Sequence, residues 1–179
     1  MVFKKGVLYW NNGELRDFEA PKIEEYLDKR AHDTFHVATL TPDDFRDTRQ
    51  RGVLGMVPGE IITTDNGYAD HVDLEKDILK IAVVERHKGT HHIGLGYIQG
   101  YGLRSGAVAT SISHDSHNII VVGTNSADMA FAANYIVEHH GGIVVVENGV
   151  VKGSVVLEIA GIMSDRPLTE VNDQVVRSL

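Results

Sequence analysis

The densest chemistry in this sequence lies in one short polar segment, SHDSHN, at residues 113–118. Its histidine rings can donate or accept a hydrogen bond, and its aspartate accepts one. A histidine beside a carboxylate can act as an oriented acid or base. The structural alternative is a polar turn whose side chains form hydrogen bonds with their own backbone. Spacing alone favours neither interpretation.

The spacing of His114 and His117 also raises the question of a metal site. An H-x-x-H pair suits one face of a helix, but this stretch is expected to form a loop. Asp115 could supply a third ligand, and no fourth is local, although a structural zinc site usually needs four. A small metal-dependent hydrolase that uses His114, Asp115 and His117 is therefore the third-ranked hypothesis.

The elements that must position this segment are apolar runs on either side of it. Ala107–Ile112 and Ile119–Val122 are rich in β-branched residues and predict strands. A third strand, predicted at Ile78–Glu85, ends in Arg86-His87. Arg86 could grip an acidic group or form a surface ion pair. Functional residues are common where strands end, because a rigid sheet fixes their side chains.

Other polar or glycine-rich patterns carry weaker signals. The glycines of GLGYIQG, from Gly94 onward, are spaced one residue too widely for a dinucleotide fingerprint. A close backbone approach or a mobile loop is expected there. Neither His91-His92 nor His139-His140 is a ready chelate, since neighbouring residues on a strand point to opposite faces. The second pair is expected to cap a helix.

The remaining patterns predict an α+β fold, with mixed β-sheets, a few packed helices and no TIM barrel. Hairpin strands are expected at Gly6–Trp10 with Glu14–Phe18, Val53–Val57 with Glu60–Thr63, and Ile143–Glu147 with Val150–Ile159. Helices are expected after the capping residues Thr41 and Asn125, and over Pro167–Leu179. A change in character divides the chain into a β-rich segment, 1–69, and an α+β unit, 70–179.

Composition excludes several classes of function. The 179 residues include no cysteine, so disulfides and thiolate metal sites are impossible. The formal net charge is -8 and no Lys/Arg cluster stands out, which argues against nucleic acid as a partner. No apolar run is long enough for a membrane span, and the amino terminus is unlike a signal peptide. A cytoplasmic protein is expected.

Four motifs in order, ERHKGT, SHDSHN, VVGTN and AGIMSD, resemble the carboxy-terminal domain of bacterial and archaeal adenine deaminases. These enzymes belong to the amidohydrolase superfamily. LTPDDFRDT and MVPGEIITTD are similar to the region that follows the barrel in that family. The likeness covers about residues 7–175, and the ordered motifs are not a generic pattern.

The resemblance implies purine salvage by hydrolysis of adenine to hypoxanthine and ammonia, with a metal-activated hydroxide as the nucleophile. It also implies a divalent metal, manganese or iron, held by a TIM-like barrel. The sequence has no H-x-H at a strand end, and such a barrel needs about 250 residues. The metal centre is therefore expected outside this chain, and the isolated chain is expected to be inactive.

Carried over position by position, the resemblance implies that eight residues form the wall of a purine pocket. They are Arg86, His87, Ser113, His114, Asp115, Ser116, His117 and Asn118. The expected partners are an amidohydrolase barrel, in the same or a separate chain, adenine, and further copies of this chain. The alternative is a non-catalytic purine-binding or assembly module.

Overall fold

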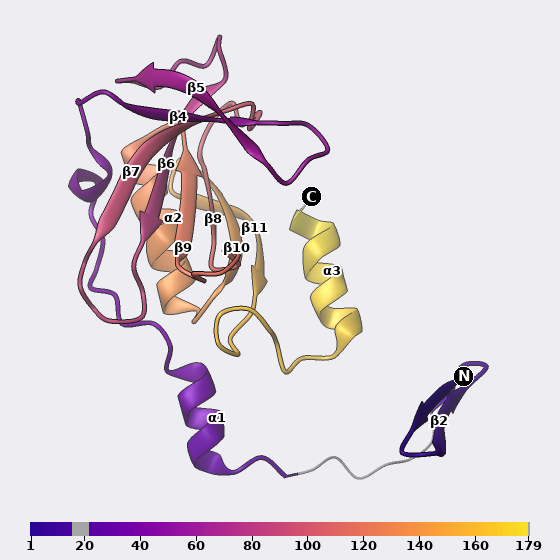
Figure 1. The fold of residues 1–179 in the computed structure, drawn as a ribbon. Coiled ribbons are helices and arrows are strands. Elements are labelled where there is room, and N and C mark those ends of the chain that lie inside the picture. Colours follow the sequence, from indigo (N-terminus) through magenta and orange to yellow (C-terminus); the bar gives the residue numbers. More distant parts are fainter. Residues whose placement is uncertain (16–21, 179) are drawn as a thin grey trace.

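An eight-stranded mixed sheet organises most of the chain in the computed structural model, which describes residues 1–15 and 22–178 (Figure 1). The strand order is β11-β10-β8-β9-β6-β7-β4-β5. The pair β4–β7 is parallel, and the other neighbours are antiparallel. The strands are β4 Arg51–Met56, β5 Thr63–Ala69, β6 Ile78–Val84, β7 Ile93–Gln99, β8 Ala107–Thr110, β9 Ile119–Gly123, β10 Gly142–Glu147 and β11 Val150–Val156. The predicted α+β class with mixed sheet is confirmed.

Helices cover one face and one edge of this sheet. Helix α2, Ser126–Glu138, lies behind the sheet in Figure 1 and packs on β8, β9 and β10. Helix α3, Leu168–Ser178, contacts β11. The short 3-10 helix η1, Pro42–Phe45, packs against α2. Among the described residues, no helix combines the length and apolar character needed to cross a membrane.

Helix α2 begins where the sequence predicts, because Asn125 caps it. The Asn125 side chain accepts a hydrogen bond from the Asp128 backbone N–H at 2.8 Å. Met129 and Ile136 are fully buried on its core face. At the other end, the His139 ring contacts the Tyr135 carbonyl at 2.9 Å, as expected of a capping residue; the same role of His140 stays a prediction.

Asp128 also joins the start of α2 to the turn between β10 and β11. Its carboxylate accepts the backbone N–H groups of Asn148 and Gly149 at 3.2 and 2.8 Å. Burial raises the pKa of Asp128, but hydrogen bonds from Asn125, Gly149 and Asn148 outweigh it and hold the pKa below its usual value. The predicted hairpin around Asn148-Gly149 is thereby fixed to the helix.

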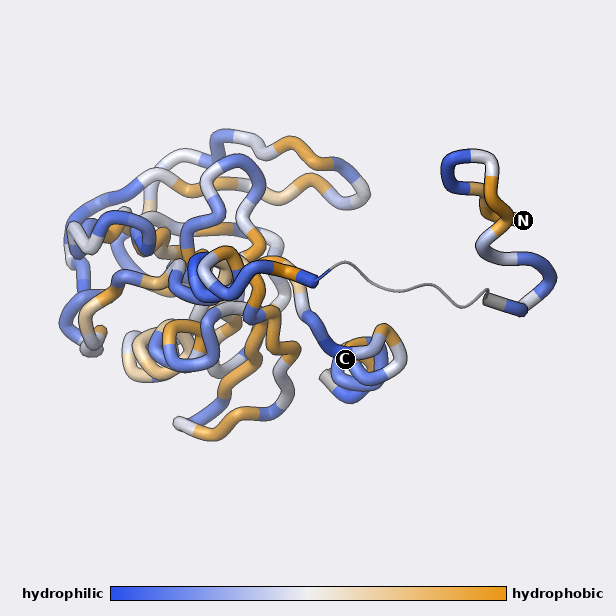
Figure 2. The backbone as a smooth tube through the Cα atoms, turned by 90° about the horizontal axis from the view of Figure 1, so that it is seen from below, coloured by the Kyte–Doolittle hydropathy of each residue, from blue (hydrophilic) through white to orange (hydrophobic). Residues whose placement is uncertain are grey.

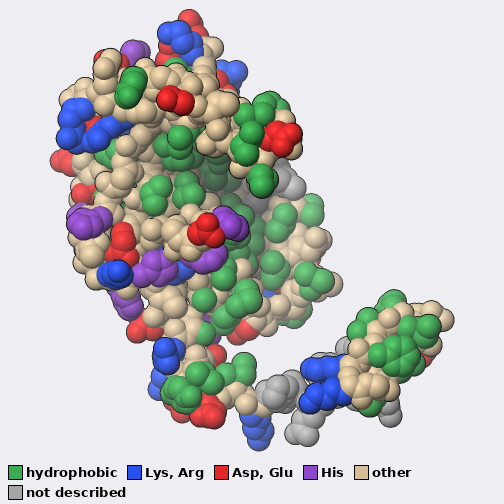
Figure 3. All heavy atoms as spheres, viewed as in Figure 1, with side chains coloured by type: hydrophobic (Ala, Val, Ile, Leu, Met, Phe, Trp, Pro, Cys, Tyr) green, Lys and Arg blue, Asp and Glu red, His purple; other side chains and the backbone are tan. Residues whose placement is uncertain are grey.

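The two faces of the sheet differ in cover. Alternate residues such as Ala82, Val84 and Val121 face α2 and are fully buried. The hydrophobic strand segments gather in the middle of this body, with hydrophilic connections around them (Figure 2). On the opposite face, Figure 3 shows apolar side chains across a hollow, and Val83 there is 38% exposed.

Two predictions about this sheet are wrong in part. The strand expected at Glu60–Thr63 instead begins at Thr63, because Met56 pairs with Thr63 and the connection occupies residues 57–62. The mobile loop considered for GLGYIQG is the strand β7. Its glycines are not required by close packing, since a Cβ built on Gly96 would make an ordinary contact, 3.5 Å, with the Gly52 carbonyl oxygen.

The first residues form a separate three-stranded sheet, with β1 Val2–Lys4, β2 Val7–Asn11 and β3 Glu14–Leu15. The predicted turn at Asn12-Gly13 is confirmed, while residues 16–18 of the expected strand lie outside the described residues. Helix α1, Glu25–His32, was not predicted, and it buries no residue. The division near residue 70 stays a prediction, and β4 and β5 belong to the same sheet as the strands after it.

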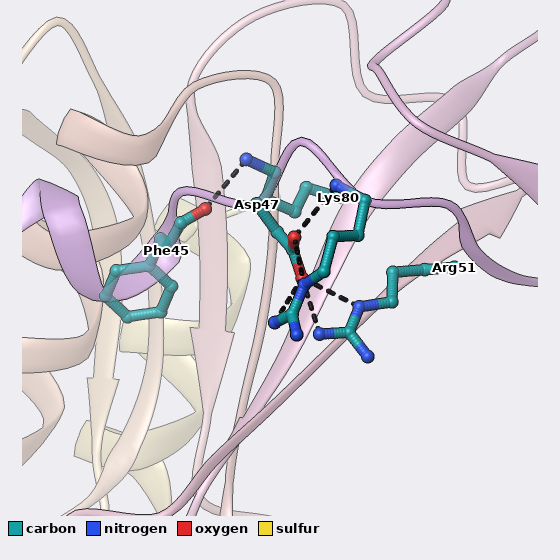
Figure 4. Close-up of polar contacts among 5 residues, drawn as sticks. Phe45, Asp47, Arg51 and Lys80 are labelled. Carbon is teal, nitrogen blue, oxygen red and sulfur yellow. Dashed lines mark hydrogen bonds and ion pairs between the residues drawn. The ribbon is translucent and has the colours of Figure 1, made fainter.

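A cluster of charges fixes β4 to the body of the domain (Figure 4). The nearly buried Asp47 side chain pairs with Arg49 and with Arg51, whose Nε lies 2.7 Å away. The hydrogen bonds from Arg49 and then Arg51 hold the pKa of Asp47 well below its usual range. Lys80 of β6 donates to the Phe45 carbonyl at 2.7 Å, and burial lowers its pKa. Together these contacts place the β4–β5 hairpin above the open face.

Candidate functional site

The polar segment at residues 113–118 is a loop between two central strands, as predicted. It leaves β8 and enters β9 at Ile119, which pairs with Val84 at the end of β6. Arg86 and His87 follow that same strand end, so the topology brings the expected residues of both segments together. The eight residues expected at a purine pocket therefore share one end of the sheet.

The loop adopts a tight conformation held by its own backbone. The His117 N–H donates to the Ser113 carbonyl at 2.7 Å, and the Ser116 N–H donates to the His114 carbonyl at 2.9 Å. Asp115 and His117 have φ angles of 66° and 47°, in the left-handed region that residues other than glycine rarely adopt. Such a conformation persists only where the surroundings enforce it.

The side chains of the loop divide into exposed and enclosed groups. His114 and Asp115 contact each other at 3.1 Å and extend into solvent, with 94% and 89% of their side chains exposed. Ser113 is buried, and its hydroxyl lies 3.1 Å from the Ser116 hydroxyl. The Nδ1 atom of His117 is buried and has no hydrogen-bond partner within residues 1–15 and 22–178. A buried polar atom without a partner is rare and marks a group that another molecule could satisfy.

Arg86 is placed differently from the rest. Its side chain is buried and donates to three main-chain oxygens, those of Thr34, His117 and Ala160. Its backbone N–H contacts the Asn118 side-chain oxygen at 3.4 Å. The guanidinium therefore holds the loop from the interior of the domain. Burial lowers the pKa of Arg86. His87 lies on the surface, with Nε2 2.8 Å from the Ser116 carbonyl oxygen.

Glu85 orders the turn that carries His87. Its carboxylate accepts the backbone N–H groups of His87 and Lys88 at 2.6 and 2.9 Å, and the Thr90 hydroxyl at 2.8 Å. Burial raises the pKa of Glu85, but these hydrogen bonds outweigh it and lower the pKa to about 2. The carboxylate stays ionised at neutral pH and keeps the turn against the loop.

The described residues do not fit a metal ion. Within residues 1–15 and 22–178, no three side chains of His, Asp or Glu lie together in a group that could hold one. His114 and Asp115 contact each other in the loop, and the buried Nδ1 of His117 makes no hydrogen bond to either of them. The donor set of the third-ranked hypothesis, a metal-dependent hydrolase, is thus not assembled.

Two hollows lie on the open face of the sheet. The larger, ≈ 590 Å³, is bounded by β4, β5, β6 and β7, with Val83, Gly94 and Gly96 in its lining. The second, ≈ 320 Å³, lies under the connection between β4 and β5 and is lined by Ile61, Ile120 and other apolar residues. Neither includes a residue of the 113–118 loop. The polar loop is therefore separate from these two apolar hollows.

The fold is thus an α+β domain with one apolar face partly uncovered and one polar loop at its end. The family model described as "Adenine deaminase C-terminal domain" matches residues 59–178. The chain belongs to this family, as its motifs predicted.

Named relatives agree with this assignment. The adenine deaminase of Bacillus velezensis is 48% identical over 76% of this chain and 25% of its own length. That of Gluconobacter oxydans is 46% identical over 72% of this chain and 24% of its own length. That of Dehalococcoides mccartyi is 37% identical over 97% of this chain and 31% of its own length. The chain thus spans a quarter to a third of these relatives.

Sequence reasoning missed the residues that hold Arg86. Thr34 and Ala160 lie 52 and 74 positions away from it and accept through their backbone oxygens, with the Thr34 hydroxyl as a further acceptor, and no sequence pattern reveals these contacts. Phe35, whose ring lies 4.2 Å from the Arg86 guanidinium carbon, is an ordinary apolar residue in the sequence. A signal was present in Gly161, within the AGIMSD motif, where a left-handed φ of 74° requires glycine.

Proposed function

We propose that this chain is the carboxy-terminal part of an adenine deaminase, which converts adenine and water to hypoxanthine and ammonia. The proposal is carried by one observation: a strained polar loop with a buried, unpartnered histidine nitrogen lies at the end of an uncovered apolar sheet face. Adenine offers ring nitrogens and an exocyclic amine, so it needs both donors and acceptors. Histidine supplies either, and aspartate accepts from an amine.

In this proposal the open face meets the metal-bearing region of the enzyme. Exposed apolar side chains from the sheet and from the β4–β5 connection, including Val83, Ile61 and Ile62, form a surface larger than isolated residues would explain. The relatives have three quarters of their length outside the matched region, which is enough for a barrel. Docking there would bring the 113–118 loop to the edge of the barrel mouth.

The metal expected for the reaction, manganese or iron, would be held by that other region. The described residues of this chain offer no suitable group of ligands, so no step of the reaction is assigned to a metal here. What the chain would supply is contact with the purine through His114, Asp115 and His117. The surrounding Ser113, Ser116 and Asn118, with His87, would fix the loop.

The test is an ammonia-release assay with adenine and manganese. The chain is assayed alone, then mixed with the preceding region of the Bacillus velezensis adenine deaminase, and the intact relative serves as the positive control. We expect no turnover by the chain alone and metal-dependent hypoxanthine formation by the mixture. Turnover by the chain alone would overturn the division of roles. Binding without turnover in any mixture would favour the non-catalytic assembly module.

A further inference from the structure

Arg86 carries a positive charge into the interior, and among the described residues none of its hydrogen-bond partners is a carboxylate. The residue is 2% exposed, and its guanidinium donates to four oxygens. These are the main-chain oxygens of His117, Thr34 and Ala160, at 2.5, 2.9 and 2.9 Å, and the Thr34 hydroxyl at 3.1 Å. A buried charge is tolerated only when its donors find such partners. The arrangement is therefore a specific one.

The three segments that Arg86 contacts are far apart in sequence. Thr34 precedes η1, His117 belongs to the polar loop, and Ala160 follows β11. One planar guanidinium can reach all three because its donors point in fixed, divergent directions. A lysine ammonium is a single point charge and cannot span the same distance. Arg86 is thus the common attachment of the loop to two other parts of the fold.

The surroundings of Arg86 are shaped for its side chain. The Phe35 ring lies 4.2 Å from the guanidinium carbon, an attractive cation–π distance. Gly161 lies against both groups: a Cβ there would lie 2.9 Å from Phe35 and 3.0 Å from Arg86 Nη2. Any side chain at position 161 would therefore push on the guanidinium. Ser111 fixes Gly161 in turn by donating to its carbonyl at 2.5 Å.

We propose that Arg86 is the positioning residue of the 113–118 loop. By holding the main-chain oxygen of His117, it enforces the left-handed conformation of that residue, φ 47°, and so sets where the imidazole lies. Arg86 itself does not touch the substrate, which differs from the pocket-wall contact expected from the sequence. The inference rests on the proposed function only in assuming that the loop faces a purine. The positioning of the loop by Arg86 does not depend on a substrate.

The test is amide hydrogen exchange, followed by NMR on the full 179-residue chain, with Arg86→Lys as the variant. The His117 N–H, bonded to Ser113, is the reporter for the loop, and amides of β9 report on global opening. We expect Arg86→Lys to speed exchange at His117 by about tenfold relative to the β9 amides, because local opening becomes easier. The ring signals of His117 should shift as well. Equal acceleration of loop and strand amides, or none, would overturn the proposal.

The matched control is Arg104→Lys, which alters an exposed arginine that also binds a main-chain oxygen, that of Leu74. This variant should leave His117 unchanged. If Arg86→Lys does not fold, Gly161→Ala takes its place, because it crowds the guanidinium without removing it. The same selective loss of protection at His117 is expected there, and its absence would count against the proposal. None of these measurements uses adenine, so a failure of the deaminase assay would leave their outcome intact.

Discussion

The two faces of the eight-stranded sheet are built from the same strands, yet one is covered by α2 and the other only in part, by a smaller cluster around Leu79, Ile98 and Val122. In β6, Val84 points toward α2 and is fully buried, while its neighbour Val83 points the other way and is 38% exposed. Both faces are apolar, although antiparallel sheets with one solvated face normally place polar residues there. The open face therefore has the composition of an interior surface, which is consistent with docking against another protein surface.

The largest expected effect comes from placing the same charge on each face. Val84→Glu buries an uncompensated carboxylate beneath α2, and we expect it to lower the free energy of unfolding by about 3–5 kcal/mol. Val83→Glu, one residue earlier, should change it by less than about 1 kcal/mol, as at other exposed positions. Urea denaturation of both variants measures the difference. Comparable losses would mean that the open face is part of the folding core.

The second prediction uses Val83→Glu as a probe of association. The uncovered apolar surface should make the wild-type chain self-associate, because large apolar patches seek cover. A charge at its centre should weaken self-association, or binding to the metal-bearing region, by about tenfold or more, as for a buried interface position. Sedimentation velocity across micromolar concentrations measures this. A wild-type chain that stays monomeric, and a variant that still binds the metal-bearing region, would together contradict a docking role for this face.

Many of the strands and helices that form the two faces could be predicted from the sequence, and what could not be predicted has physical causes. β-branched runs predicted β6, β8 and β9, and Asn125 predicted the start of α2, because these signals are local. The position of β5 was missed because the register, Met56 with Thr63, is set across the sheet. That one sheet face stays open depends on which strands neighbour each other, and alternation alone does not show it.

The candidate site shows the same limit. The SHDSHN loop was predicted as a loop with concentrated polar chemistry, and the structure places it next to Arg86 and His87. The inward turn of Arg86 was not predicted, because its partners are distant backbone oxygens, including that of Ala160. The substrate contacts of the eight residues stay a prediction, which the next substitution addresses.

The third prediction separates a substrate role of the loop from a structural one. In an assembly that deaminates adenine, His117→Ala should lower kcat/KM by at least tenfold, while the melting temperature stays nearly unchanged, because no group in the structure loses a partner from Nδ1. Asp115→Asn, at an exposed position, should also spare stability. Full activity together with a large drop in melting temperature would assign the loop to the fold alone.

The smallest effect concerns the turn that borders the loop, and it depends on pH. Hydrogen bonds to Glu85 from Thr90, His87 and Lys88 outweigh its burial and lower its pKa to about 2, from an ordinary value of 4.5. Because the folded pKa is the lower one, the stabilisation from Glu85 is fully present above about pH 4.5 and is lost as pH falls toward 2.

We therefore expect the amide signals of His87, Lys88 and Thr90 to titrate together with a midpoint near pH 2, as the carboxylate that accepts their N–H groups becomes protonated. Glu85→Gln keeps the side-chain shape but cannot ionise, so the same amides should show no transition in this window. NMR chemical shifts from pH 6 to about pH 1 measure both proteins. The covered core around Val84 should not respond at that midpoint, because the Glu85 carboxylate accepts its hydrogen bonds from its own turn. A midpoint near 4.5 would show that the amides of the turn do not bind the Glu85 carboxylate. It would contradict the inference that this turn is firmly held.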